Sequence, residues 1–367
     1  MELRIDVSEF SRALANTQGI VQKRNTMPIL ANVLIEASED GNLDLVATDL
    51  DIGIRCSGKA EVVAPGSMTV NARALYDIVR ALPVKEATLK RLENNYVEVR
   101  ADRVHYKIVG TAPDEFPRLP SLEGVTFARF DTAALKEMVE KTFYSVSTDE
   151  TRYNLNGVFF ELKDEGLIMV STDGHRLSRI MRKLNVELDL EEGVILPRKG
   201  LNELRRLFDS GAGGIEFGVK GSHAVVRHDN VTVVMRLIDG TFPDYEQVIP
   251  KESSKRVQLR RDELTKALQR ISLVSNDKSH SVKVELQSGL LRISSQNPDL
   301  GEGQEELPVE YSQEDLSIGF NARYLIDALN AIGSDNVYLE VNDDLSPGLL
   351  RAEDDDGYIC VVMPMRI

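Results

Sequence analysis

The sequence lacks the features that mark membrane and secreted proteins. No apolar run approaches the length of a membrane span, and the opening MELRIDVSEF is too charged for a secretory signal. Only two cysteines occur, Cys56 and Cys360, in strand-like surroundings that match no metal or redox spacing. We therefore interpret both as small buried residues of a protein in a reducing compartment. We therefore expect a cytoplasmic protein, and 42% apolar residues suffice for several cores.

Catalytic and cofactor-binding signatures are also missing. Residues Gly53–Ala60, GIRCSGKA, come close to a phosphate-binding loop, but Ala60 has no hydroxyl to hold magnesium, and strand and turn follow. No nucleophile has a partnered base, and His223 and His228 lack metal-ligand spacing. The acidic run Glu353–Asp356 lacks the alternation of a calcium loop. We expect no catalytic residue, no metal and no cofactor.

What the chain does contain is a threefold repeat at a spacing of about 120 residues. Each repeat opens with an amphipathic helix whose apolar residues fall at matching places, and a second such helix follows later in the repeat. The first helices are expected at Ile5–Leu14, Phe130–Val139 and Leu259–Leu268, and the second at Asn71–Leu82, Pro197–Phe208 and Asn321–Ile332.

Between the two helices of each repeat, apolar and polar residues alternate around a turn, in segments that start at Leu34, Phe159 and Val284. This pattern is typical of antiparallel strands with one wet face. The first two repeats close with DEFPRLP and GTFPDYEQVIP, whose prolines end the strand pattern and indicate an extended connector. We expect an α+β protein with three domains, at 1–120, 121–250 and 251–367.

The charge is unevenly distributed. A net charge of −15 argues against a nucleic-acid partner. The predicted helices carry about +6 when counted over 8–24, 72–81, 131–145, 197–209, 260–275 and 321–331, which leaves about −21 elsewhere. Lysine and arginine are good helix formers, which would explain the count without a partner. The repeat favours a basic surface instead, and with few aromatics there it would bind phosphates without reading bases.

Two carboxylate pairs offer a different hypothesis. Asp49 and Asp51 in TDLD, and Asp173 with His175 in STDGHRL, resemble the clusters of a metal-dependent nuclease. The third repeat has Gln296 and Asn297 at that place, however, and Asp-Gly is a common turn former. A turn at a hairpin end is favoured. An acidic protein-binding scaffold without a DNA role is the third hypothesis.

Five segments together identify a family. They are RYNLNG at Arg152, STDGHRL at Ser171, PRKG at Pro197, DGTFPDY at Asp239 and the terminal VVMPMRI. From end to end the chain resembles the bacterial sliding clamps, the beta subunits of DNA polymerase III. The resemblance implies three DNA-clamp domains, each with two helices packed on antiparallel sheets, and two chains joined head to tail in a ring of six domains. It also implies a processivity factor that encircles duplex DNA, without sequence specificity and without a catalytic site.

The resemblance implies partners and site residues as well. The partners would be duplex DNA, a second copy of the chain, polymerase subunits, a clamp loader and repair proteins, the proteins docking through short linear motifs. The DNA-facing positions would be Arg24, Arg73, Arg152, Tyr153 and Lys199, with Arg198, Arg205 and Arg206 added by the charge count. The dimer interface would include Tyr76 and Tyr106 on one side and Leu273 and Val274 on the other. The peptide pocket would comprise Leu155, Thr172, Gly174, His175, Arg176, Leu177, Pro243, Val248, Ser346, Val361, Met363, Pro364, Met365 and Arg366.

Departures from the family pattern bear on both sites. Asn154 stands where a second tyrosine is common, and Thr148 and Asp149 replace neutral or basic polar groups, so we expect an altered DNA contact at this loop. Gln247 stands where an arginine is familiar, and Ser279 and His280 where a larger apolar group is. We therefore expect an altered preference for peptide motifs.

Overall fold

The computed structural model describes residues 1–21, 27–163, 166–184, 186, 188, 190, 192–209 and 213–366. By their internal contacts these residues form two compact units, which we describe separately. Unit 1 comprises Met1–Thr132, Val186–Asp189 and Lys199–Leu237, and unit 2 comprises Ala133–Asn185, Leu190–Arg198 and Ile238–Ile367.

All six predicted helices are present. They are α1 (Val7–Thr17), α2 (Ala72–Arg80), α3 (Thr132–Phe143), α4 (Arg198–Phe208), α5 (Arg261–Ser272) and α6 (Ala322–Ala331). Three begin behind a side-chain cap, where Asp6, Asn71 and Asn321 accept hydrogen bonds from first-turn amides. The first helix is shorter than the range used for the charge count, because α1 ends at Thr17. Its positive charge was therefore overestimated.

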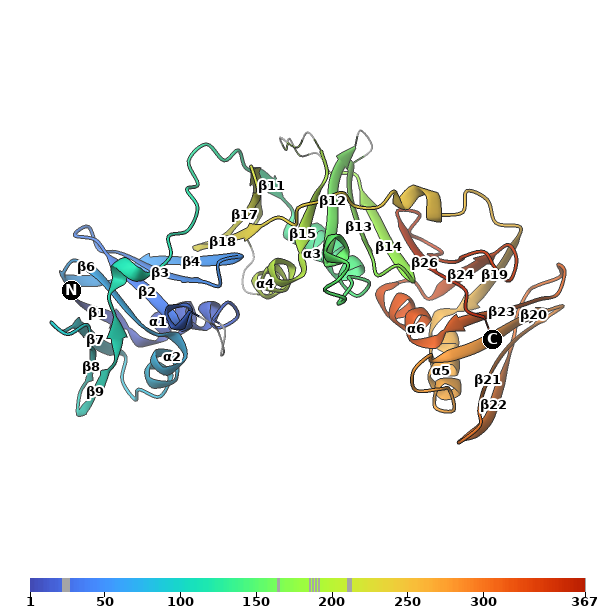
Figure 1. The fold of residues 1–367 in the computed structure, drawn as a ribbon, viewed down its shortest axis with the longest axis horizontal. Coiled ribbons are helices and arrows are strands. Elements are labelled where there is room, and N and C mark those ends of the chain that lie inside the picture. Colours follow the sequence, from blue (N-terminus) through green and yellow to red (C-terminus); the bar gives the residue numbers. More distant parts are fainter. Residues whose placement is uncertain are drawn as a thin grey trace. The chain divides into compact units, whose positions relative to one another are not determined.

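Unit 1 holds two antiparallel sheets, and α1 packs against α2 and against strands β3 and β4 (Figure 1). The five-stranded sheet has the order β5 (Glu61–Ala64), β1 (Glu2–Asp6), β7 (Glu86–Arg91), β8 (Val97–Ala101), β9 (Val104–Ile108). The nine-stranded sheet has the order β10 (Gly110–Thr111), β6 (Gly66–Asn71), β2 (Asn32–Ala37), β3 (Asn42–Thr48), β4 (Ile52–Lys59), β18 (Val231–Arg236), β17 (His223–His228), β16 (Ile215–Lys220), β11 (Ala128–Phe130).

Unit 2 repeats this arrangement, with α5 packed against α6 and against β20, β21 and β22 (Figure 1). Its eight-stranded sheet has the order β15 (Val194–Pro197), β12 (Gly157–Lys163), β13 (Gly166–Thr172), β14 (Arg176–Arg182), β26 (Tyr358–Val362), β25 (Gly348–Ala352), β24 (Asn336–Val341), β19 (Lys255–Arg260). Its four-stranded sheet has the order β22 (Gly301–Pro308), β21 (Leu290–Asn297), β20 (Ser281–Gln287), β23 (Leu316–Asn321).

Consecutive repeats are joined by the same strand pair. Strand β4 of the first repeat pairs with β18, the last strand of the second, and β14 of the second pairs with β26, the last strand of the third. The register is also shared, because Cys56 lies opposite Val231 and Ile180 opposite Tyr358. The corresponding strands that remain are β22 and β9, and each ends its sheet in the described part of the chain.

Alternating strands and helices bury one apolar face in each repeat, as the sequence pattern predicts. Both cysteines are buried and free. None of the helices in the described ranges has the length and apolar character needed to cross a membrane.

Candidate nucleic-acid interface and peptide pocket

Helix α4 is the most basic of the six helices, with four cations against the single carboxylate of Glu203. Lys199, Arg205 and Arg206 are exposed, whereas Arg198 is half-buried and its guanidinium lies 5.4 Å from the ring centre of Phe143. On α2, Arg73 is exposed and 3.8 Å from Asp77, a loose pair that contributes little to stability. The candidate Arg24 lies outside the described residues.

Arg152 and Tyr153 lie at a short 3-10 helix, Tyr153–Leu155. Tyr153 is 56% exposed, so it is available for contact. Arg152 donates from Nη1 to the carbonyl oxygen of Asp173, 3.1 Å away, and Asn154 donates from Nδ2 to the carbonyl oxygen of Thr241 at 3.0 Å. The segment is therefore anchored to two neighbouring loops on either side of Tyr153.

Asp149 keeps a negative charge beside this segment. Hydrogen bonds from the hydroxyl and backbone amide of Thr151 hold the pKa of Asp149 below its ordinary value, and its carboxylate lies 3.9 Å from Arg152. A phosphate that approaches Arg152 meets this carboxylate, which weakens the attraction. The departure at Asp149 thus places a negative charge beside a candidate DNA contact.

The two carboxylate motifs form turns at hairpin ends. The side chain of Asp173 accepts hydrogen bonds from the backbone amides of His175 and Arg176 at 2.9 and 3.0 Å, and Gly174 has φ +87°. The side chain of Asp49 likewise accepts hydrogen bonds from the amides of Asp51 and Ile52, at 3.1 and 2.8 Å. These are the bonds of a side-chain-stabilised turn.

The remaining carboxylate oxygens of the two turns are also engaged. Oδ2 of Asp173 lies 3.1 Å from Arg176, and Oδ2 of Asp49 lies 3.0 Å from Lys199. Within the described ranges no group of three or more His, Cys, Asp or Glu side chains is placed to hold a metal ion. The geometry does not favour the nuclease hypothesis.

The peptide-pocket candidates converge on the junction of β14 and β26. Leu177 lies opposite Val361 across the two strands, and both belong to one apolar cluster with Leu155, against which Val248 packs. Just beyond the strands, the amide of Met363 donates to the carbonyl oxygen of His175 at 2.8 Å. Residues far apart in the sequence are therefore brought together here. Thr172, Gly174 and Arg176 belong to the adjoining turn.

The remaining pocket candidates lie on other segments of unit 2. Pro243 is exposed next to the buried Phe242 of the cluster, and Met365 donates its amide to Gly319 at 2.8 Å. Ser346 lies between β24 and β25, where its hydroxyl donates to Asp343 at 2.9 Å. Pro364 is half-buried, and Arg366 is exposed.

Two residues of this region were not predicted. The ring of Tyr324 on α6 stacks on His175 with centroids 6.3 Å apart, and the guanidinium of Arg176 lies 4.5 Å from the Tyr324 ring centre. Asp327, one turn further along α6, accepts a 2.5 Å hydrogen bond from Arg176. In the charge count this helix was neutral, and no local sequence pattern indicates these contacts between residues far apart in the chain.

The departures near the pocket have defined contacts. Gln247 donates to Asp244 at 2.8 Å, and Ser279 donates to Ser281 at 3.2 Å. His280 adopts φ +47°, and its carbonyl oxygen accepts the amide of Ala322 at 2.9 Å, at the start of α6.

Three of the four dimer-interface candidates lie on or near the edge strands β9 and β22, and the fourth lies on α2. Tyr106 on β9 is 40% exposed, and Leu273, just after α5, is 76% exposed. Val274 lies beside β22, because a Cβ on Gly303 would come 3.0 Å from its Cγ2. Tyr76 on α2 is half-buried and packs under Arg80.

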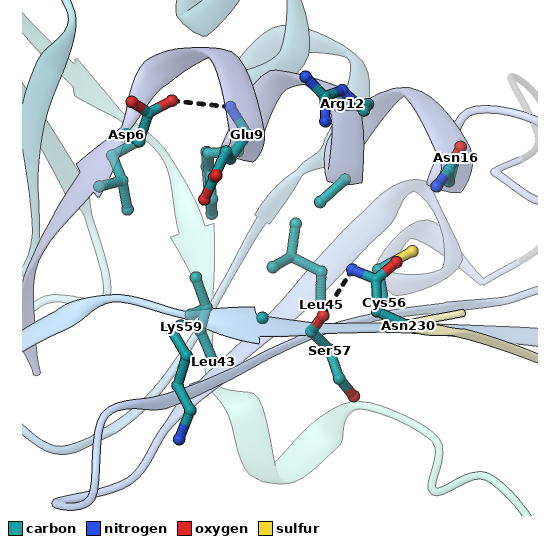
Figure 2. Close-up of a pocket in the computed structure, with 14 residues that line it drawn as sticks. Asp6, Glu9, Arg12, Asn16, Leu43, Leu45, Cys56, Ser57, Lys59 and Asn230 are labelled. Carbon is teal, nitrogen blue, oxygen red and sulfur yellow. Dashed lines mark hydrogen bonds between the residues drawn. The ribbon is translucent and has the colours of Figure 1, made fainter. Parts of the chain in front are cut away.

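A cavity of about 250 Å³ lies in unit 1 between α1 and strands β3 and β4 (Figure 2). At the matching place in the second repeat, Arg182 forms ion pairs with Glu137 and Asp355 at 2.6 and 2.7 Å. Gly58 corresponds to Arg182, and a Cβ there would meet no atom within 4 Å. The cavity thus marks a missing side chain. Burial raises the pKa of the bordering Cys56 to about 12, so its thiol is not a nucleophile at neutral pH.

Comparison with known families accounts for the whole fold. Three domain families of the DNA polymerase III beta subunit match the chain in order: the N-terminal domain at residues 1–120, the central domain at 129–244 and the C-terminal domain at 246–366. These matches follow the three repeats along the chain.

Full-length relatives agree. The beta sliding clamp of Vibrio cholerae is 33% identical over 369 residues and covers all of both chains. The crystal structure of the C. crescentus beta sliding clamp with bound polyethylene glycol has a TM-score of 0.95 at 35% identity and full coverage of both chains. That of a Bartonella birtlesii clamp bound to griselimycin has a TM-score of 0.94 at 34% identity, again with full coverage. The chain therefore belongs to the DNA polymerase III beta subunit family, the sliding clamps of bacterial DNA replication, which are processivity factors and not enzymes.

Proposed function

We propose that two copies of this chain close head to tail into a ring of six domains that encircles duplex DNA and tethers the polymerase. The three domains would span residues 1–120, 121–250 and 251–367. The observation that supports the ring best is the recurrent junction between repeats. Within the chain this junction forms twice, between β4 and β18 and between β14 and β26. The strands that would form it a third time, β22 and β9, lie at the edges of two different sheets in the described part of the chain. A second copy would complete it and remove both edges.

The repeat also predicts the register of this third junction. Carrying the observed pairing over to the free strands places Val104 opposite Glu305 and Lys107 opposite Glu302. The charges are complementary, because β22 carries three glutamates and β9 carries Lys107 and His105. Opposite charges on facing strands support this alignment over a slipped one.

DNA would be held by contacts to its sugar–phosphate backbone alone, with the arginines and the lysine on phosphates and Tyr153 packed on the sugars. The proposed contacts are Arg24, Arg73, Arg152, Tyr153, Arg198, Lys199, Arg205 and Arg206. Those the structure describes are exposed, apart from the half-buried Arg198, and they offer no platform of stacked aromatics. Phosphate contacts position a protein without reading sequence, so the contact would be non-specific and sensitive to salt.

Partner proteins would dock a short apolar motif at the β14–β26 junction. The apolar cluster around Leu177 and Val361 would accept aliphatic side chains, and the half-buried methionines Met363 and Met365 would adapt to different motifs. The clamps crystallised with polyethylene glycol and griselimycin support a ligand site in this family. Polymerase subunits, a clamp loader and repair proteins are the proposed users of this pocket.

Topological linkage is tested by loading the chain on nicked circular DNA and then cutting the circle. A closed ring slides off the new ends, so the retained fraction falls to the level seen on DNA that was linear from the start. Blocking both ends with a bulky protein should restore retention. Equal retention on the cut and uncut circle would reject encirclement.

A further inference from the structure

Two nearly buried carboxylates hold two exposed cations of α4. The side chains of Asp49 and Glu203 are 4% and 7% exposed, whereas those of their partners Lys199 and Arg206 are 57% and 63% exposed. All four line one cavity of about 310 Å³ in unit 1, together with Gly19, Ile20, Ile52 and Asn202. In each pair the carboxylate faces inward and the cation outward.

The geometry fixes both pairs. Asp49 is held by the two turn amides and lies 3.0 Å from Nζ of Lys199. Both carboxylate oxygens of Glu203 accept hydrogen bonds from Nη1 of Arg206, at 2.9 and 3.2 Å. Gly19 packs directly on this second pair, because a Cβ there would lie 1.7 Å from Nη1 of Arg206 and 2.4 Å from Glu203.

Burying these two carboxylates costs folding free energy, because each loses most of its contact with water. Burial raises the pKa of Glu203, Arg206 opposes that change, and the nearby negative charge of Asp49 adds to it. A neighbouring negative charge disfavours the ionised form of a buried carboxyl such as that of Glu203. The position of these two carboxylates beside the cations of the most basic helix therefore calls for a role beyond stability.

We propose that Asp49 and Glu203 are positioning residues that limit how strongly Lys199 and Arg206 attract duplex DNA. This inference rests on the proposed DNA-facing role of α4. A paired carboxylate cancels most of the distant field of its cation, so a phosphate must compete with the protein for that charge. The ring remains linked to DNA without holding any one phosphate, and weak contacts allow it to slide.

The test is duplex binding by the full-length dimer over a range of salt concentrations, measured by fluorescence anisotropy with D49N and E203Q. Each variant should bind more tightly, on the order of fivefold at 0.1 M salt, and its log–log salt slope should steepen by up to about 0.9 for the freed cation. D51N is the matched control, because Asp51 is an exposed carboxylate in the same turn. It removes an equal charge and should change binding less.

A double-mutant cycle separates this inference from the proposed function. K199A should weaken binding, and adding D49N to K199A should then have no further effect. If K199A and R206A bind as the unsubstituted chain does, α4 does not face DNA and the proposed interface is wrong. If K199A weakens binding while D49N matches D51N or binds no more tightly, the positioning role is overturned. Thermal unfolding of each variant shows whether it is folded.

Discussion

Arg152 donates a hydrogen bond to the carbonyl oxygen of Asp173, 3.1 Å away, and so links a candidate DNA contact to the turn that borders the peptide pocket. The contact is close, because a Cβ on Gly174 would lie 2.4 Å from Nη1 of Arg152. One guanidinium thus touches segments assigned to two different ligands. Binding of a ligand at one site should therefore change the affinity of the other site for its ligand.

R152A should weaken duplex binding by a few-fold and flatten the salt slope by up to about 0.9, because one phosphate contact is lost. It should also change the affinity for a polymerase-derived peptide, since the turn loses its support. Anisotropy measures the first effect and calorimetry the second. R4A is the control, because Arg4 is exposed and pairs with Glu61 outside every proposed site. An unchanged peptide affinity in R152A would argue against the link.

The strand register at the dimer junction predicts a charge-swap result. K107E should place like charges opposite Glu302 and raise the dimer dissociation constant by about tenfold or more. E302K should do the same, and the double variant should recover most of the dimer. Sedimentation at several concentrations gives the constants. Failure of the double variant to recover, with both single variants folded, would show that the two strands pair in another register.

An ion network in unit 2 predicts a pH-dependent stability. Burial alone would raise the pKa of Asp355, but hydrogen bonds from Arg182 and Lys141 outweigh it and hold the pKa below the ordinary value. The pKa of Glu137 is lowered mainly by its hydrogen bond from Arg182. Lowered pKa values stabilise the fold above the unfolded-state values of 3.8 and 4.5, and that contribution is lost as the pH falls below them.

D355N should therefore lower the free energy of unfolding by about 1–3 kcal/mol at pH 7, because it leaves two cations with one carboxylate. The difference from the unsubstituted chain should shrink as the pH falls from 5 towards 3. Denaturant titrations at a series of pH values measure this. The exposed neighbour gives the control D356N, which should change stability by less than about 0.5 kcal/mol. A constant difference across the pH range would contradict the assignment.

Neither thiol should react in the folded protein. Burial raises the pKa of Cys56 to about 12 and also raises that of Cys360. Ellman's reagent should therefore detect almost no thiol at pH 8 until denaturant is added, and then two per chain. Rapid reaction without denaturant would show that β4 or β26 opens locally.

Sequence periodicity was sufficient to predict the helices and strands, but it did not predict the side-chain contacts between them. Apolar spacing placed α2 and α6 to within two residues, because each buries one face on a sheet. It ended the first helix at Leu14, and the charge count ran to residue 24, whereas α1 ends at Thr17, two residues before Gly19. The pairs Arg176 with Asp327 and Lys199 with Asp49 join residues about 150 positions apart, and local patterns hold no information on such pairings.

The recurrence of one strand junction has a consequence for assembly. Every copy carries both halves of the same joint, so a third and a fourth copy have the same affinity for a free end as the second. Only the rotation angle between two copies joined at this junction decides whether growth stops at two copies or continues into an open filament. Substitutions that alter this angle while leaving the facing residues intact should yield fibres, although each copy remains correctly folded.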